Sequence, residues 1–202
     1  MAKSISLPVC DHKPRRYTGP SKAEVLALRQ QYLTPALITY YKEPFMAVEG
    51  HMQYLWDEKG TRYLDAFAGI VTVSVGHCHP TVVERVREQV GVLQHTTTIY
   101  IHPTVGQYAK RLAEKMPGDL KVTYFTNSGS ETNDLAILTA RMYTGMFDVI
   151  ALRNAYHGGS QSTMGLTAHS TWKYTTPHSF GVHHGMPGYC YRCPLGLTYP
   201  SC

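Results

Sequence analysis

The stretch from Tyr124 to Gly159, YFTNSGSETNDLAILTARMYTGMFDVIALRNAYHGG, indicates the fold class of this 202-residue chain. Together with the residues just before it, it predicts a strand over 121–126, a helix over 131–144 and a second strand over 148–152. A strand, a crossover helix and a further strand in this order are typical of a parallel sheet. We therefore expect an α/β protein.

The turn between the first strand and the helix, Ser128-Gly129-Ser130-Glu131, predicts a phosphate site. The first amides of a helix have no partner within the helix, its dipole favours an anion there, and small residues allow close approach. We expect Gly129 and Ser130 to hold the phosphate, with Tyr156 and His157 over the attached flat ring. The alternative is a plain helix cap, in which Ser128 or Ser130 satisfies the amides without a ligand.

Three further segments accompany this turn in the order and spacing of one family: TRYLDAFAGI (61–70), SVGHCHP (74–80) and AYHG (155–158). With them, the chain resembles the class III pyridoxal 5'-phosphate (PLP) aminotransferases of fold type I. Residues 70–80, IVTVSVGHCHP, are especially similar to the mitochondrial alanine–glyoxylate aminotransferase branch. The resemblance extends from about Cys10 to the C-terminus.

The resemblance implies a cofactor, PLP, and a set of residues that bind it. By it, Gly129 and Ser130 hold the phosphate, Tyr156 stacks on the pyridine ring and His157 packs or hydrogen-bonds near that ring. Ile70 occupies a position where relatives contact substrate, and its alternative is an ordinary core residue.

The resemblance also implies an activity, a partner and a location. The reaction is a transamination that moves an amino group from L-alanine, or a related donor, to glyoxylate or another 2-oxo acid. The partner is a second copy, in a homodimer or higher oligomer. The location is mitochondrial, although residues 1–20 form no clear transit peptide, and otherwise cytoplasmic.

The lysine that forms the Schiff base in this family has no counterpart here, because none of the nine lysines matches a catalytic position. We therefore expect an inactive fragment or truncated isoform, made of a small-domain segment and an incomplete, mostly parallel large-domain sheet. The alternative is an inactive partner of the full-length subunit. The expected divisions are a flexible arm (1–20), an N-terminal helix and β-meander of the small domain (21–70), the first part of the PLP-binding large domain (71–160) and a loop-rich incomplete tail (161–202).

Local signals predict the elements of the first half. Ser21 and Glu24 have the spacing of a capping box, which opens a helix that ends near Leu33. Pro80 and Pro103 stand at the first position of two further helices. Three strands are expected over 45–49, 53–56 and 61–65, with a turn at 57–60.

Composition excludes several classes of function. The net charge is +5, but no Lys/Arg-rich run is present, so nucleic-acid binding is not expected. No apolar stretch is long enough for a transmembrane helix. Five cysteines, an odd number, favour a reducing compartment over a disulfide framework.

Two groups of residues resemble metal ligands. The adjacent His77-Cys78-His79 cannot easily direct three side chains at one ion, so we expect a structural role. In the tail, Cys190 and Cys193 with His183-His184 and Cys202 would suit a zinc-stapled binding module. A second paired knuckle is missing, so unliganded loop thiols are favoured.

Overall fold

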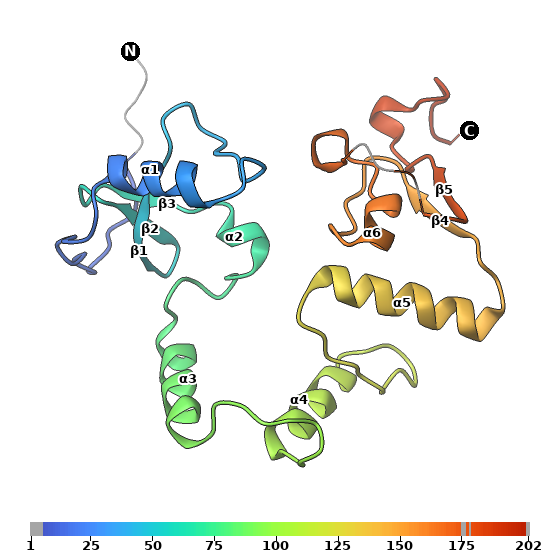
Figure 1. Ribbon diagram of the computed structural model, residues 1–202, viewed down its shortest axis with the longest axis horizontal. Helices are drawn as coiled ribbons and strands as arrows, with labels where there is room; N and C mark the ends of the chain where they lie inside the picture. The colour runs from blue at the N-terminus through green and yellow to red at the C-terminus, as the bar shows by residue number, and fades with distance from the viewer. Residues whose placement is uncertain (1–5, 175–176, 178, 201–202) are drawn as a thin grey trace. The chain divides into compact units, whose positions relative to one another are not determined.

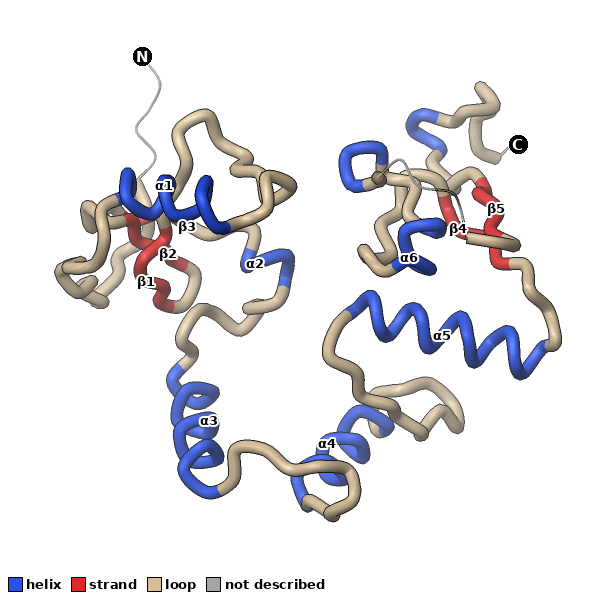
Figure 2. Tube along the Cα trace, viewed as in Figure 1, coloured by secondary structure: helices blue, strands red, loops and turns tan. Residues whose placement is uncertain are grey.

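The computed structural model is of mixed α/β type and describes residues 6–174, 177 and 179–200. The chain forms two compact units, Met1–Tyr100 and Ile101–Cys202 (Figure 1). Each unit has its own small sheet (Figure 2). The two units are therefore described separately.

The sheet of the first unit is an antiparallel meander in the order β1-β2-β3. Its strands are β1 (Ala47–His51), β2 (Tyr54–Asp57) and β3 (Arg62–Leu64). Tyr54 and Trp56 of β2 are 1% and 2% exposed and form the core. Asp57 closes the predicted turn, since its carboxylate accepts from the Lys59 and Thr61 amides (3.0 and 2.8 Å). The three predicted strands and their turn are confirmed, with shifts of one or two residues at most ends.

The helices of the first unit begin where the sequence signals place them. Helix α1 (Lys22–Tyr32) has the full capping box: the Ser21 hydroxyl accepts from the Glu24 amide (3.3 Å), and the Glu24 carboxylate accepts from the Ser21 amide (2.7 Å). Helix α3 (Pro80–Val92) begins at its proline, as predicted. Between them lies the single turn α2 (Ala68–Val71).

Part of the segment expected to be a flexible arm lies on strand β1. The His12 ring is 2.6 Å from the Glu49 carboxylate, and the Arg15 amide donates to the same carboxylate (2.8 Å). The His12 ring also stacks on that of His51, with centroids 4.3 Å apart. These contacts hold residues near His12 against the sheet.

The second unit contains a parallel pair of strands, β4 (Val149–Leu152) and β5 (Val182–Gly185). Helix α6 (Gln161–Leu166) lies between them in the chain, followed by the 3-10 turn η1 (Ser170–Trp172). Helices α4 (Pro103–Ala113) and α5 (Gly129–Thr144) come before the pair, and the 3-10 turn η2 (Cys190–Arg192) follows it. No described helix has the length and apolar character needed to cross a membrane.

Two predictions for this unit are wrong. Residues 121–126 form no strand, and Val122 and Tyr124 are 97% and 77% exposed. A parallel strand needs a neighbour to accept its hydrogen bonds, and no described segment pairs with this one. The β-α-β unit is instead β4-α6-β5, so the tail, expected to be rich in loops, supplies α6 and β5. Met164 and Leu166 of α6 are 6% and 5% exposed and belong to the core.

Candidate functional site

The N-terminus of α5 presents unpaired amides. Ser128 is the N-cap, and its hydroxyl accepts from the Glu131 amide (3.2 Å). The Glu131 carboxylate accepts from the Asn127 amide (2.7 Å). Within the described residues, the amides of Gly129 and Ser130 donate no hydrogen bond. The helix cap that we considered as an alternative is present, but it leaves two donors available.

A second segment, His157–Gly159, is tied to this helix end. The Gly159 amide donates to the Ser130 hydroxyl (3.1 Å), and the Asn133 side chain donates to the His157 carbonyl (2.7 Å). Gly158 has a φ of +124°, and a Cβ there would lie 2.4 Å from the Ser130 hydroxyl oxygen. Only glycine allows this approach without strain. We call Ser128–Ser130 together with His157–Gly159 the α5 N-terminal site.

Two buried threonines of residues 160–167 lie against the site. Thr163 and Thr167 are both 0% exposed. The Thr167 hydroxyl accepts from the His157 amide (3.0 Å) and donates to the Gly158 carbonyl (3.2 Å). Thr163 forms a capping box with Ser160 at the start of α6. Serine is a favoured N-cap residue, so Ser160 is a local signal for this helix in a segment that the sequence analysis assigns to a loop.

His157 belongs to the site, and Tyr156 precedes it in the chain. The Tyr156 side chain is 57% exposed, and its ring meets Trp172 edge-on at 6.2 Å. The Nε2 atom of His157 is buried and has no hydrogen-bond partner among the described residues. An unpaired buried nitrogen costs about 1–3 kcal/mol, so this atom is one that a ligand or a further protein group would stabilise.

The arrangement fits a phosphate with an attached ring. Two unpaired amides, the positive end of a sixteen-residue helix and a hydroxyl converge on one place. A Cβ at Gly129 would meet nothing within 4 Å, so space is open beside these donors. The exposed ring of Tyr156 offers a flat face. The donor set can therefore accept the phosphate of a phosphorylated cofactor.

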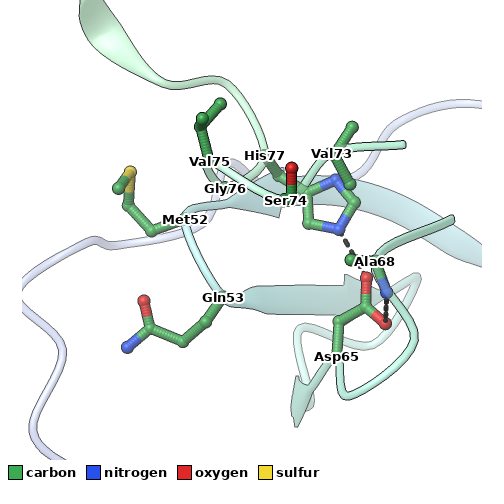
Figure 3. Close-up of a pocket in the computed structure, with 9 residues that line it drawn as sticks. All are labelled: Met52, Gln53, Asp65, Ala68, Val73, Ser74, Val75, Gly76 and His77. Atoms are coloured by element: carbon green, nitrogen blue, oxygen red, sulfur yellow. Dashed lines mark hydrogen bonds and ion pairs between the residues drawn. The ribbon is translucent and has the colours of Figure 1, made fainter. Parts of the chain in front are cut away.

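Ile70 belongs to the first unit. It lies in α2 with a φ of +61° and is 70% exposed among the described residues. The loop 66–76 around it borders a pocket of about 290 Å³ (Figure 3), which is also lined by Met52, Gln53, Asp65 and His77. The His77 ring forms a hydrogen bond with the Asp65 carboxylate (2.7 Å), a contact that no sequence pattern indicates.

The tail cysteines are free thiols, Cys190 exposed and Cys193 half-buried. The histidines that were considered with them have other partners: His183 faces Asp148 at 3.6 Å, and His184 donates to the Leu166 carbonyl (3.1 Å). Cys202 lies outside the described residues. Among those that are described, no three His, Cys, Asp or Glu side chains are grouped as metal ligands.

The family model for aminotransferase class-III matches residues 39–195. The chain belongs to the class III aminotransferase family. Among curated members, it is 47% identical over 190 residues to the mitochondrial alanine–glyoxylate aminotransferase 2 homolog 2 of Arabidopsis thaliana. It is 44% identical over 193 residues to the human mitochondrial alanine–glyoxylate aminotransferase 2. These matches cover 94% and 96% of this chain but only 40% and 38% of the relatives.

Solved structures of the family agree with the fold. An (S)-enantioselective omega-transaminase from Thermomicrobium roseum superposes with a TM-score of 0.77 at 33% identity, over 90% of this chain and 43% of that one. A phospholyase from Arthrobacter, in complex with phosphoethanolamine, superposes with a TM-score of 0.72 at 30% identity. That match covers 79% of this chain and 37% of the phospholyase chain. Class III aminotransferases use PLP, amino-acid substrates and oxo-acid substrates. The chain spans about two fifths of the length of these relatives.

Proposed function

We propose that the α5 N-terminal site holds the phosphate of PLP in an aminotransferase of the alanine–glyoxylate branch. The observation that carries this proposal is the pair of unpaired amides at Gly129 and Ser130, beside a hydroxyl held by the Gly159 amide. These donors would bind the phosphate, and the helix dipole would add to the attraction. Ser130 keeps its position because Gly158 leaves room for it.

Tyr156 and His157 hold the ring in this proposal. The exposed face of Tyr156 would stack on the pyridine and fix its plane, while Trp172 supports the tyrosine from its edge. The unpaired Nε2 of His157 is a hydrogen-bonding group beside the same segment, and we assign it a packing or hydrogen-bonding role. PLP, when bound, supplies an electron-withdrawing ring through which an amino group passes from a donor to an acceptor.

The substrates that we propose are L-alanine, or a related amino donor, and glyoxylate or another 2-oxo acid. The identity to two alanine–glyoxylate aminotransferase 2 relatives supports this choice. Ile70 would present an apolar side chain to the small substrate, which its exposure permits. The reactive lysine would have to come from the part of the family's length that this chain does not span.

The remaining assignments also follow the relatives. We propose the PLP-dependent transferase fold type I with a mostly parallel large-domain sheet, a homodimer or higher oligomer, and a mitochondrial location. The four divisions expected from the sequence (1–20, 21–70, 71–160 and 161–202) remain part of this proposal. The mitochondrial names of both curated relatives support the location.

Ser130→Glu and Ser130→Gln, made in the full-length product of the gene that encodes this chain, test the proposal. The two side chains have the same size, but only glutamate places a negative charge where the phosphate would lie. We expect Ser130→Gln to retain some PLP and Ser130→Glu to lose it, by at least about tenfold in affinity, because like charges repel. The measurement is PLP content by absorbance and by phosphorus analysis. Equal PLP content in Ser130→Glu and the unaltered protein would overturn the assignment.

A further inference from the structure

Both ends of loop 66–76 are fastened to one corner of the sheet in the first unit. At one end, the Asp65 amide donates to the Gln53 carbonyl (2.9 Å). At the other, Met52 and His77 exchange two backbone hydrogen bonds of 2.7 and 2.8 Å. The loop therefore begins and ends at the turn between β1 and β2.

The side chain of Asp65 joins these two ends. One carboxylate oxygen accepts from the amides of Phe67 and Ala68, both at 2.9 Å. The other oxygen is 2.7 Å from the His77 ring nitrogen (Figure 3). The Asp65 side chain is 9% exposed and that of His77 21%, so water competes little for these bonds. Hydrogen bonds from His77 and the two amides hold the pKa of Asp65 below its ordinary value.

The loop that is closed in this way is strained and displays apolar side chains. Ala68, Ile70 and Val71 all have φ between +52° and +61°. Each such residue costs about 1–2 kcal/mol, and β-branched residues are uncommon there. Ile70 and Val71 are nevertheless 70% and 76% exposed. Strain of this kind persists only where neighbouring contacts enforce it, and it is concentrated at ligand sites.

Gly50 of strand β1 provides the space in which the His77 ring lies. A Cβ at Gly50 would be 2.9 Å from the Cβ of His77 and 3.0 Å from its Cγ. Distances under 3.0 Å do not occur for real Cβ atoms, so a side chain at Gly50 would displace His77. The loop thus depends on a position that is not adjacent to it in the chain.

We propose that Asp65 and His77 are positioning residues that hold the strained loop 66–76 in a substrate-facing conformation. This inference rests on the proposed function, because the substrate is the one assigned there. Asp65 stabilises the left-handed turn directly, and His77 fixes Asp65 in the orientation that the turn needs. Neither residue touches the reacting atoms. Ile70 and Val71 form the surface that the pair positions.

The test combines two measurements on the full-length product of the gene. The first is hydrogen exchange of the amides in residues 66–76, which reports the loop itself. The second is a steady-state transaminase assay with L-alanine and glyoxylate, together with PLP content. The variants are Asp65→Ala, His77→Ala and Gly50→Ala. Gly91→Ala in α3 is the matched control, because a Cβ there meets nothing within 4 Å.

We expect each of the three variants to speed exchange in the loop by at least about tenfold. We also expect each to raise the KM for the substrates by about tenfold, with kcat and PLP content within about threefold of the unaltered protein. Asp65→Asn keeps an oxygen for the two backbone amides and an amide group facing His77. Its loop exchange rate and its KM should therefore stay near those of the unaltered protein. Gly91→Ala should change neither.

Several results would overturn the inference. If the amides of residues 66–76 exchanged at the same rate in Asp65→Ala as in the unaltered protein, Asp65 would not position the loop. Faster exchange with an unchanged KM would show that the pair is only structural, and the proposed function would stand. Loss of PLP in all three variants would place the effect on the cofactor instead. No transaminase activity in the unaltered protein would refute the proposed function and the substrate role together.

Discussion

The two units fasten a site loop in the same manner but with different chemistry. In each, one short polar side chain binds the loop, and one glycine leaves the space: Asp65–His77 with Gly50, and Ser130–Gly159 with Gly158. The first contact joins a carboxylate to an imidazole, whereas the second joins a hydroxyl to a backbone amide. From this difference we expect acid to weaken the first contact, because it contains a carboxylate, and to leave the second unchanged, because it has no ionisable group.

Gly158→Ala should have the largest effect, because it disrupts the contact that holds the second loop. A Cβ there would lie 2.4 Å from the Ser130 oxygen and 3.0 Å from the Ser130 Cα, at a φ of +124°. We expect a loss of about 2–3 kcal/mol of unfolding free energy and at least about tenfold weaker PLP binding. Gly159→Ala is the control, because a Cβ there meets nothing within 4 Å. Thermal unfolding and a PLP titration are the measurements, and equal behaviour of the two variants would contradict the role of Gly158.

The second largest effect is expected from acid, which should weaken one loop at a higher pH than the other. The pKa of Asp65 is lowered in the folded protein, so its contribution is fully present above about pH 4 and is lost as the pH falls through the lowered value. The contact between Ser130 and Gly159 has no ionisable group. Exchange protection, corrected for intrinsic rates between pH 7 and 2, should fall in residues 66–76 before it falls in residues 157–159. In Asp65→Asn, residues 66–76 should no longer lose their protection before residues 157–159. If the unaltered protein lost protection in both segments at the same pH, the prediction would be wrong.

The smallest effect is expected for an ion pair outside both loops. Arg85 and Glu88 of α3 are 2.8 Å apart, but their side chains are 78% and 53% exposed. An exposed pair is worth little, so Glu88→Gln should change the unfolding free energy by about 0.5 kcal/mol or less. Denaturant unfolding measures this change. A loss of more than about 1 kcal/mol would show that charge alone, without burial, stabilises this unit.

Elements with local signals could be predicted from the sequence. The capping box of Ser21 and Glu24, the proline start of α3 and the turn at Asp57 involve residues at most four positions apart. The N-cap at Ser128 was foreseen as an alternative for the same reason. Such contacts depend on spacing, which a sequence states directly.

Contacts that depend on a distant partner could not be predicted. Residues 121–126 have the composition of a strand, but composition does not supply the neighbour that a strand needs. Asp65 and His77 lie twelve positions apart, and nothing in their spacing indicates that they meet. Helix α6 is six residues long and contains Gly165, so its apolar period was too short to detect.

An amide NMR titration of the 202-residue chain tests the central claim most directly. Isotope-labelled protein would receive PLP in one series and pyridoxal, which lacks the phosphate, in the other. The account predicts that the amide resonances of Gly129 and Ser130 shift saturably when PLP is added, since these unpaired donors bind the phosphate. The same resonances should not shift when pyridoxal is added. Equal shifts with both compounds, or shifts only at other residues, would contradict it.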